Sequence, residues 1–545
     1  MDDIPPPSLM YTYLPPKKDK FFKKLYKYHQ NSGFICILVS QIFYILTISF
    51  SISITFFMTS CVDWDKLNDQ EKNLFSAVYP NCIPDGGHSW LKIILILLLL
   101  VGLVSTFVTS GKQLYSMYKV HNFFRDSLGI HKLTTWEDVI FKCNERLNTG
   151  CNIDAEYVAN RIMRYDNYLI SMVTKDIFGL DSLPSVITFT KILEWNLHTC
   201  IKATLLKQDG VLMEEVLHRD YSKREHFTKT LENNFKILGI LNIVFTPFIV
   251  TGLLVYFCYK YVSEYHRNPK ALKMYSFTPL AKWKLRDFNE LEHIYTKRIN
   301  FAQPKISEYL EKFRSNVLDT FVQFLSFIVG TILFFLLLVS FGSPETLIFD
   351  QPLIYHIGIL TALYMQIETS GNNSVVEDID SFDETFNELV DVLHYTPKSW
   401  NNLSNDERYY EIKRLFKYKW VNFMNEILCV FYVPIILLFW LPKKSSNIVN
   451  FFRENSVHVD KLEIICSNAL FNFDVDGFRD DEDSIQRKMS QSVKNFKNAY
   501  KFTDHNSDSE SDTGTIRPTR QSVEPSGSEM EFDSLLSKIT THRLP

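Results

Sequence analysis

The sequence FICILVSQIFYILTISFSISITFFMTS, residues 34–60, decides the fold because it carries no charged side chain over 27 consecutive positions. A helix that crosses the hydrocarbon core of a bilayer needs about 20 apolar residues. Two further stretches, residues 93–111 and residues 320–341, are also free of charge over a spanning length. Such runs are rare in soluble proteins, so the sequence predicts an all-α polytopic membrane protein.

Three other apolar stretches are less decisive. Residues 352–367 are short, whereas residues 237–259 and residues 427–441 each contain a proline, Pro247 and Pro434 respectively. For each of the three, a buried helix of a soluble domain fits the composition as well as a membrane helix does.

The charges that flank these stretches indicate a topology, because cytosolic loops carry an excess of Lys and Arg. Six lysines precede residue 34, whereas loop 61–90 has two lysines and loop 342–351 has no basic residue. Both loops are therefore expected in the lumen and both termini in the cytosol. The two proline-containing stretches are basic on both sides. A spanning helix would bring one basic flank into the lumen, so we expect two re-entrant or partly embedded elements, each bent at its proline.

The predicted organisation therefore has four transmembrane helices and two re-entrant elements. Its parts are a cytosolic N-terminal tail (1–33), a first transmembrane hairpin (34–118) with lumenal loop 61–90, a cytosolic helical region (119–317) with re-entrant element 237–259, a second transmembrane hairpin (318–368) with lumenal loop 342–351, cytosolic helices (369–475) with re-entrant element 427–441, and a disordered acidic, Ser-rich tail (476–545).

Both tails contain patterns that resemble sorting signals. Tyr11 and Leu14 form a Y-x-x-L pattern, and Glu531 precedes Leu535 and Leu536 in the spacing of an acidic dileucine signal. Short patterns of this kind also occur by chance. A solvated tail without a sorting signal is therefore the other interpretation of the Y-x-x-L pattern.

The first lumenal loop holds two cysteines, Cys61 and Cys82. An oxidising lumen permits a disulfide between them, and two free thiols are the alternative.

Composition and motifs exclude several classes of protein. The 58 basic and 62 acidic residues give a net charge of −4, which argues against a nucleic-acid partner bound by bulk positive charge. No P-loop, GxGxxG, HExxH or GxSxG motif is present, and the 14 histidines and 9 cysteines show no metal-ligand spacing. We therefore expect no enzyme, no cofactor and no metal, and a passive or structural role in the membrane.

Polar residues inside the apolar stretches have two interpretations. Examples are Ser40, Gln41, Gln323, His356 and Asn242. They could form hydrogen bonds between helices, or they could line a groove along which a lipid headgroup slides while its tails stay in the bilayer.

Several sequence blocks together resemble the autophagy-related protein 9 family. They are NRIMRYDNYLI with VTKDI (160–177), LEWNL (193–197), EYHRNP (264–269), PLAKWKLRDFNEL (279–291), HYTP (394–397) and VD…CSNA (459–469). These blocks occur in the family's order and cover about residues 28–475, which makes the resemblance specific.

The resemblance implies a domain-swapped homotrimeric phospholipid scramblase of Golgi- and endosome-derived vesicles, which acts at the preautophagosomal membrane during autophagosome formation and expansion. It also implies autophagy-related protein 2, a lipid-transfer protein, as a partner. Arg267, with His266 and Lys273, falls where the family has a basic cluster in a lateral cavity, so we expect these side chains to contact lipid headgroups. An arginine that snorkels to the membrane surface is the alternative for Arg267.

Other strongly patterned residues are expected to serve packing or trimer contacts in the cytosolic region. They are Arg161, Arg164, Lys175, Arg286, Asn289 and Glu290. Two functional alternatives stay open: a vesicle scaffold that recruits the autophagy machinery, and an ion channel through the trimer axis.

Overall fold

The computed structural model describes residues 18–57, 61–62, 89–131, 134–147, 153–184, 187–218, 220–267, 274–313, 316–342, 347–348, 351–371, 380–395, 400, 403–471 and 484–500. The chain divides into two units, residues 1–496 and residues 497–545. Nearly all described residues belong to the first unit.

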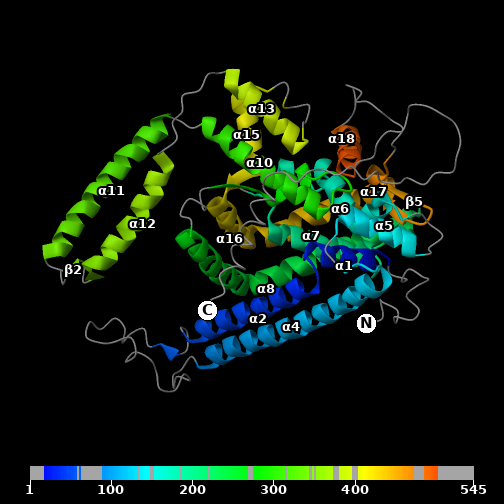
Figure 1. The fold of residues 1–545 in the computed structure, drawn as a ribbon, viewed down its shortest axis with the longest axis horizontal. Helices are drawn as coiled ribbons and strands as arrows, with labels where there is room; N and C mark the ends of the chain where they lie inside the picture. Colours follow the sequence, from blue (N-terminus) through cyan, green and yellow to red (C-terminus); the bar gives the residue numbers. More distant parts are fainter. Residues whose placement is uncertain are drawn as a thin grey trace, which may run out of the picture. The chain divides into compact units, whose positions relative to one another are not determined.

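Helices form most of this unit (Figure 1). In chain order they are α1 (Lys18–Gln30), α2 (Phe34–Phe56), α4 (Ser89–Asn122), which continues into the π-helix η3 (Phe123–Ser127), α5 (Trp136–Arg146), α6 (Ala155–Thr174), α7 (Lys191–Leu205), α8 (Tyr221–Arg267), α9 (Pro279–Leu285), α10 (Glu292–Lys312), α11 (Asn316–Gly342), α12 (Leu353–Gly371), α13 (Asp380–Leu393), α15 (Asn405–Leu415), α16 (Lys419–Ile435), the π-helix η7 (Ile436–Trp440), α17 (Leu441–Glu454) and α18 (Ser484–Ala499). The prediction of a helical membrane protein is confirmed.

Side-chain caps fix where helices α6, α7 and α9 begin. The hydroxyl of Thr190 accepts a hydrogen bond from the backbone N–H of Leu193 and starts α7, and Thr278 does the same for α9 with Pro279 at the first helical position. Asp154 caps α6 in the same manner. These side chains satisfy backbone donors that have no partner within the helix.

The described residues form three short antiparallel strand pairs, of which the first joins segments far apart in the chain. They are β1 (Tyr275–Phe277) with β4 (Phe416–Tyr418), β2 (Leu347–Ile348) with β3 (Gln351–Pro352), and β5 (Ser456–Val459) with β6 (Glu463–Cys466). In the first pair, the rings of Tyr275 and Tyr418 stack with centroids 4.4 Å apart. This pair borders a core in which α10, α13 and α15 bury side chains such as Tyr309, Leu389 and Ile412.

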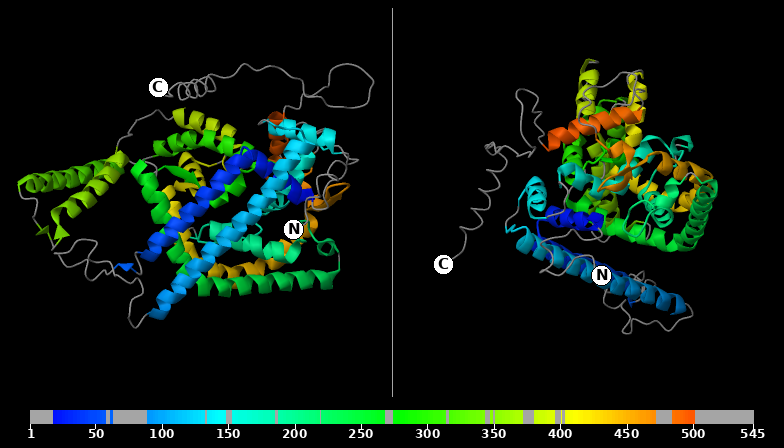
Figure 2. Two further views of the ribbon diagram at one scale, coloured as in Figure 1. Left: turned by 60° about the horizontal axis from the view of Figure 1, so that its bottom comes forward. Right: turned by 90° about the vertical axis from the view of Figure 1, so that its right-hand side faces the viewer.

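Among the described residues, four helical stretches are long and apolar enough to cross a membrane. They are Phe34–Ile54 in α2, Tyr221–Leu254 in α8, Thr320–Ser340 in α11, and Lys419–Glu454 across α16, η7 and α17. In the first three, only 6%, 11% and 0% of the apolar window is buried by this chain. Lipid or further protein must therefore cover these surfaces in the cell. Figures 1 and 2 show α2 beside α4, and α11 beside α12.

Neither proline opens the turn that we expected. Pro247 lies inside the 47-residue helix α8, and Pro434 lies inside α16, where the chain stays helical through η7 and α17. A proline removes one backbone donor, and local adjustments can absorb this loss without ending a helix. Near Pro434 the adjustment is the π-helix that comes after it. The re-entrant or spanning nature of both segments stays a prediction.

The expectation of a disordered tail from residue 476 is wrong for α18. This helix buries Ile485, Lys488, Ser492 and Phe496 on one face, a spacing typical of an amphipathic helix. The sequence analysis missed this helix because its buried face is short and includes the polar residues Lys488 and Ser492, so the segment as a whole has a polar composition. Residues 501–545, and with them Glu531, Leu535 and Leu536, lie outside the described residues, as do Tyr11 and Leu14.

Candidate functional site

The residues predicted to contact lipid headgroups stand at the end of α8. His266 and Arg267 are its last two residues, and their side chains are outside the described part of the structure. Lys273 lies outside the described residues altogether. Their role in headgroup contact stays a prediction.

The arginines of the first family block form a buried ion network with α1. Arg161 Nη1 donates to Asp19 Oδ1 at 2.8 Å, and Arg164 donates to Asp19 through Nε at 2.5 Å and Nη2 at 3.2 Å. Arg161 also donates to the carbonyl oxygen of Lys461, and Arg164 to that of Ile464 at 2.5 Å. The two guanidinium groups thus join α1, α6 and the β5–β6 hairpin inside the protein, and their predicted role in packing or trimer contacts stays a prediction.

The RDFNEL block forms a second buried polar cluster. Glu290 binds both Nε and Nη2 of Arg298 at 2.9 and 2.7 Å. Asn289 adopts φ 57°, a left-handed conformation that Asn tolerates better than most residues, and its side-chain oxygen accepts a hydrogen bond from Asn167 of α6. Arg286 reaches Glu292 at 3.1 Å.

Lys175 completes this set of family residues by donating to Asn455 Oδ1 at 2.9 Å. All six residues predicted for packing or trimer contacts therefore have partners within one chain, and a trimer role stays a prediction for each.

A polar contact joins α7 to the apolar helix α8. Asn242 Nδ2 donates to Asn196 Oδ1 at 2.8 Å, and both residues are buried. Earlier in α8, Asn234 Nδ2 donates to Thr204 Oγ1 at 2.8 Å. Of the two interpretations for polar residues in apolar stretches, Asn242 fits the hydrogen bond between helices. The outer face of α8, by contrast, exposes apolar side chains such as Phe245.

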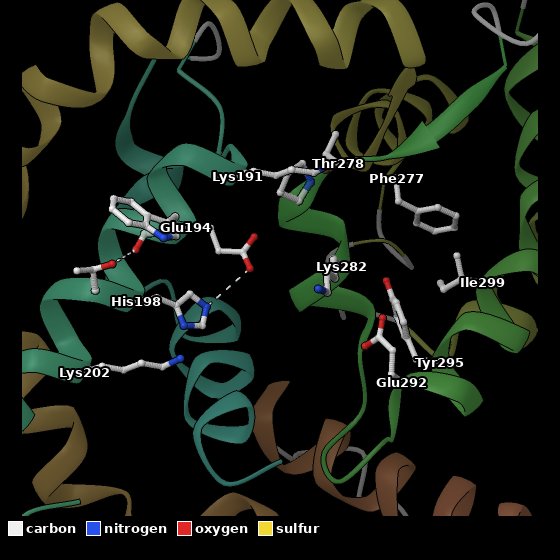
Figure 3. A pocket seen from close by; sticks show the side chains of 13 residues that line it. Lys191, Glu194, His198, Lys202, Phe277, Thr278, Lys282, Glu292, Tyr295 and Ile299 are labelled. Carbon is white, nitrogen blue, oxygen red and sulfur yellow. Dashed lines mark hydrogen bonds and ion pairs between the residues drawn. The ribbon is translucent and has the colours of Figure 1, made fainter. Parts of the chain in front are cut away.

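A cavity of about 690 Å³ lies on the other side of α7, between this helix, α9 and α10 (Figure 3). Three lysines line it, Lys191 and Lys202 from α7 and Lys282 from α9. Two glutamates, Glu194 and Glu292, complete the charged part of the lining. Its volume falls within the range of about 300–1,000 Å³ that is typical of small-molecule sites.

Both glutamates of this cavity have cationic or ionisable neighbours. Glu194 Oε1 lies 3.7 Å from His198 Nε2, and Glu292 pairs with Arg286. Burial lowers the pKa of the Lys202 ammonium, although the nearby Asp166 acts in the opposite direction. The arrangement concentrates lysines that can bind an anion.

The remaining walls are apolar or aromatic. Phe277, Tyr295 and Ile299 line the cavity on the side of β1 and α10, and Trp195 of α7 is 61% exposed at the same cavity. Sequence reasoning missed this site because its residues come from two segments far apart in the chain, 191–202 and 277–299. The LEWNL block, which contributes Glu194 and Trp195, was the available signal. Among the described residues, no cluster of three metal-ligating side chains is placed to hold a metal ion.

Cys61 is disulfide-bonded. The disulfide partner of Cys61 is a cysteine whose side chain is not described, because the other described cysteines are free: Cys36, Cys143, Cys200, Cys429 and Cys466. Cys82 lies outside the described residues, and its pairing with Cys61 stays a prediction.

The structure has apolar helices that are long enough to cross a membrane, and they join a helical body with buried ion networks and a lysine-lined cavity. These features define a multi-helix membrane protein. The family model described as autophagy protein ATG9 matches residues 17–472. The chain therefore belongs to the ATG9 family.

Individual relatives agree with this assignment. Autophagy-related protein 9 of Saccharomyces cerevisiae strain YJM789 is 30% identical over 520 residues, which cover 89% of this chain and 51% of the relative. The protein of the same name from Sclerotinia sclerotiorum is 31% identical over 495 residues, 84% of this chain and 51% of the relative. The chain thus spans about half the length of these curated relatives. The cryo-EM structure of Schizosaccharomyces pombe Atg9 superposes with a TM-score of 0.63 at 26% identity, covering 84% of this chain and 99% of that one.

Proposed function

We propose that this protein is an energy-independent phospholipid scramblase that acts in autophagosome formation and expansion. It would equilibrate lipids between the leaflets of autophagy vesicles without making or breaking a covalent bond. The proposal includes a domain-swapped homotrimer, with both termini in the cytosol, on Golgi- and endosome-derived vesicles and the preautophagosomal membrane. Autophagy-related protein 2 would supply lipid to it. Membership of the ATG9 family supports the role in autophagy.

The observation that carries scrambling is the position of α7. One face of this helix binds the apolar helix α8 through Asn196, and another face presents Lys191, Lys202 and Trp195 to the lysine-lined cavity. A headgroup at these lysines would lie within one helix of the apolar surface of α8 that this chain leaves uncovered. A scramblase needs such an arrangement, because headgroups require polar partners while the tails stay in an apolar environment.

Scrambling is measured with the full chain in liposomes that carry a fluorescent phospholipid. Dithionite bleaches the outer leaflet, so about half of the fluorescence survives in protein-free vesicles. We expect the protein to allow bleaching well beyond half without calcium or ATP. Bleaching that stops near half, with the protein folded and reconstituted, would contradict scrambling and favour the vesicle-scaffold alternative.

A matched pair of variants tests the headgroup role of Arg267. Arg267→Leu should slow the bleaching of the inner leaflet, because it removes a cation at the end of α8. Arg125→Leu is the control, since Arg125 is 65% exposed in η3 and does not line the lysine-lined cavity. Equal rates for both variants would remove Arg267 from the proposed path.

A further inference from the structure

Lys202 separates two cavities. The first is the cavity between α7, α9 and α10. The second has a volume of about 580 Å³ and is lined from α1, α6, α7 and the turn that comes after α7. Lys202 lines both, and its Nζ lies 4.5 Å from the centre of the Tyr165 ring. Both cavities therefore border this one side chain.

No described carboxylate lies within ion-pair distance of Lys202. Asp166, which faces it across the second cavity, has Arg286 Nη1 3.9 Å from its own carboxylate. Asp19 belongs to the same lining, but Arg161 and Arg164 already neutralise it. The Lys202 ammonium group therefore has no anionic partner among the described residues, and a bound anion would supply one.

The polar groups around Lys202 also lack partners. The Tyr165 hydroxyl is buried and makes no hydrogen bond with any described residue, and Tyr165 as a whole is 4% exposed. The His198 ring stands 4.8 Å from the Tyr165 ring, and its Nδ1 is equally without a described partner. Burial raises the pKa of Tyr165 well above its usual value, so the hydroxyl keeps its proton and can donate. Buried polar atoms are rarely left unpaired, which points to a missing acceptor.

The second cavity is rich in lysine beyond Lys202. Lys20 and Lys23 reach it from α1, and Lys207 from the turn after α7. Asp209 is the one acid of this lining that no described cation neutralises within ion-pair distance. The lysines of this lining therefore favour an anion.

We propose that the two cavities beside Lys202 form a binding site for the phosphate group of a membrane phospholipid, with Lys202 and the Tyr165 hydroxyl as its central donors. Lysine is a common phosphate ligand, and both cavities open beside it. We favour a lipid over a free phosphate because Phe277 and Ile299 extend the first cavity with apolar surface, where an acyl chain fits. The inference rests on the proposed function and names headgroup contacts for it that are distinct from Arg267.

The test measures binding separately from scrambling. The full chain, purified in detergent, is irradiated with a phosphatidylcholine that carries a diazirine on its acyl chain, and the labelled peptides are identified by mass spectrometry. We expect labelling within α7 and residues 277–299 that excess unlabelled phosphatidylcholine abolishes. Lys202→Gln should weaken that competition at least about tenfold, as the loss of one charge-assisted hydrogen bond implies.

Two further variants keep the test decisive. Tyr165→Phe retains the buried ring and should fold, yet it should weaken competition about threefold through the lost hydroxyl. Lys223→Gln is the control, because Lys223 is exposed in the first turn of α8 and lines neither cavity. Equal competition in all three variants and the wild type overturns the proposal.

Two other outcomes are informative. If millimolar inorganic phosphate displaces the probe as well as phosphatidylcholine does, the site serves a soluble phosphate and the lipid assignment is wrong. If Lys202→Gln loses binding while wild-type vesicles show no scrambling, the proposed function fails and the binding site stands. Intact binding in Lys202→Gln together with active wild-type scrambling defeats this inference alone.

Discussion

Asp19 is the single acid that holds two buried arginines, so its substitution is the sharpest test of how this protein is assembled. Asp19 is 5% exposed, and Arg161 and Arg164 are 1% and 2% exposed. Asp19→Asn keeps the shape of the side chain but removes its charge, and its amide N–H₂ would point at guanidinium donors. Both arginines would then be buried without a counter-charge, a situation that costs about 3–5 kcal/mol.

The hydrogen bonds give a similar figure. Asp19 accepts three bonds from the two arginines, two at Oδ1 and one at Oδ2, so the single carbonyl of an asparagine can retain one or two of them. The one or two charge-assisted bonds that are lost cost about 1.5–3 kcal/mol each, which is a loss of the same order. For a large domain, each kcal/mol lowers the melting temperature by about 2 °C, so we expect a decrease of at least about 5 °C.

The assay is thermal unfolding of the purified protein in detergent, together with hydrogen exchange at about 25 °C. Exchange should accelerate in α1 and in the β5–β6 hairpin, because Arg161 and Arg164 also bind backbone carbonyls there. Lys27→Gln is the control, since Lys27 is exposed on the same helix. If Asp19→Asn melts with the control and α1 stays protected, the network does not anchor α1 and the reasoning is refuted.

Three other substitutions test separate features. Burial lowers the pKa of Lys488 to about 7, so above that pH the unfolded chain binds one more proton than the folded chain. The free energy of unfolding should therefore rise by up to about 1.4 kcal/mol per pH unit between pH 7 and 10. Lys488→Met should remove this rise, as measured by thermal unfolding at several pH values. Burial also lowers the pKa of His293 to about 4, so stability should fall as pH drops from about 6.5 towards 4, and His293→Gln should flatten that acid limb. A Cβ on Gly330 would stand 2.9 Å from the Tyr364 ring, so Gly330→Leu should cost about 1–3 kcal/mol in thermal unfolding, whereas Gly102→Leu, which meets open space, should melt with the wild type.

The sequence predicted the class of this protein well because membrane helices carry a local signal. Residues 34–60 and 320–341 reveal themselves by composition alone, and they become α2 and α11. The packing role of Arg161 and Arg164 also came from the family block. Their partner did not, because Asp19 lies 142 and 145 residues away and its own surroundings are a lysine-rich run.

The cavities beside Lys202 could not be predicted for the same reason. Their lining residues come from α1, α6, α7, α9 and α10, and the chain brings these elements together through long-range packing. Lysines at the surface and lysines in a cavity have the same sequence appearance. The difference becomes visible in the cavities that Lys202 lines and in the buried Tyr165 hydroxyl beside it, which has no described partner.

The two signals for the Pro247 segment disagree: its basic flanks predict a re-entrant element, whereas helix α8 is long and apolar enough to span a membrane. The basic residues that we read as a cytosolic flank, among them Lys229 and Lys236, belong to the helix itself. Its first turns pack on the protein through Leu231 and Phe235, which are fully buried, and the apolar surface begins beyond them. The rule that counts Lys and Arg assumes a loop next to a span. Here the same helix passes from a protein environment to an apolar surface without a loop, and Asn242 binds α7 near that transition.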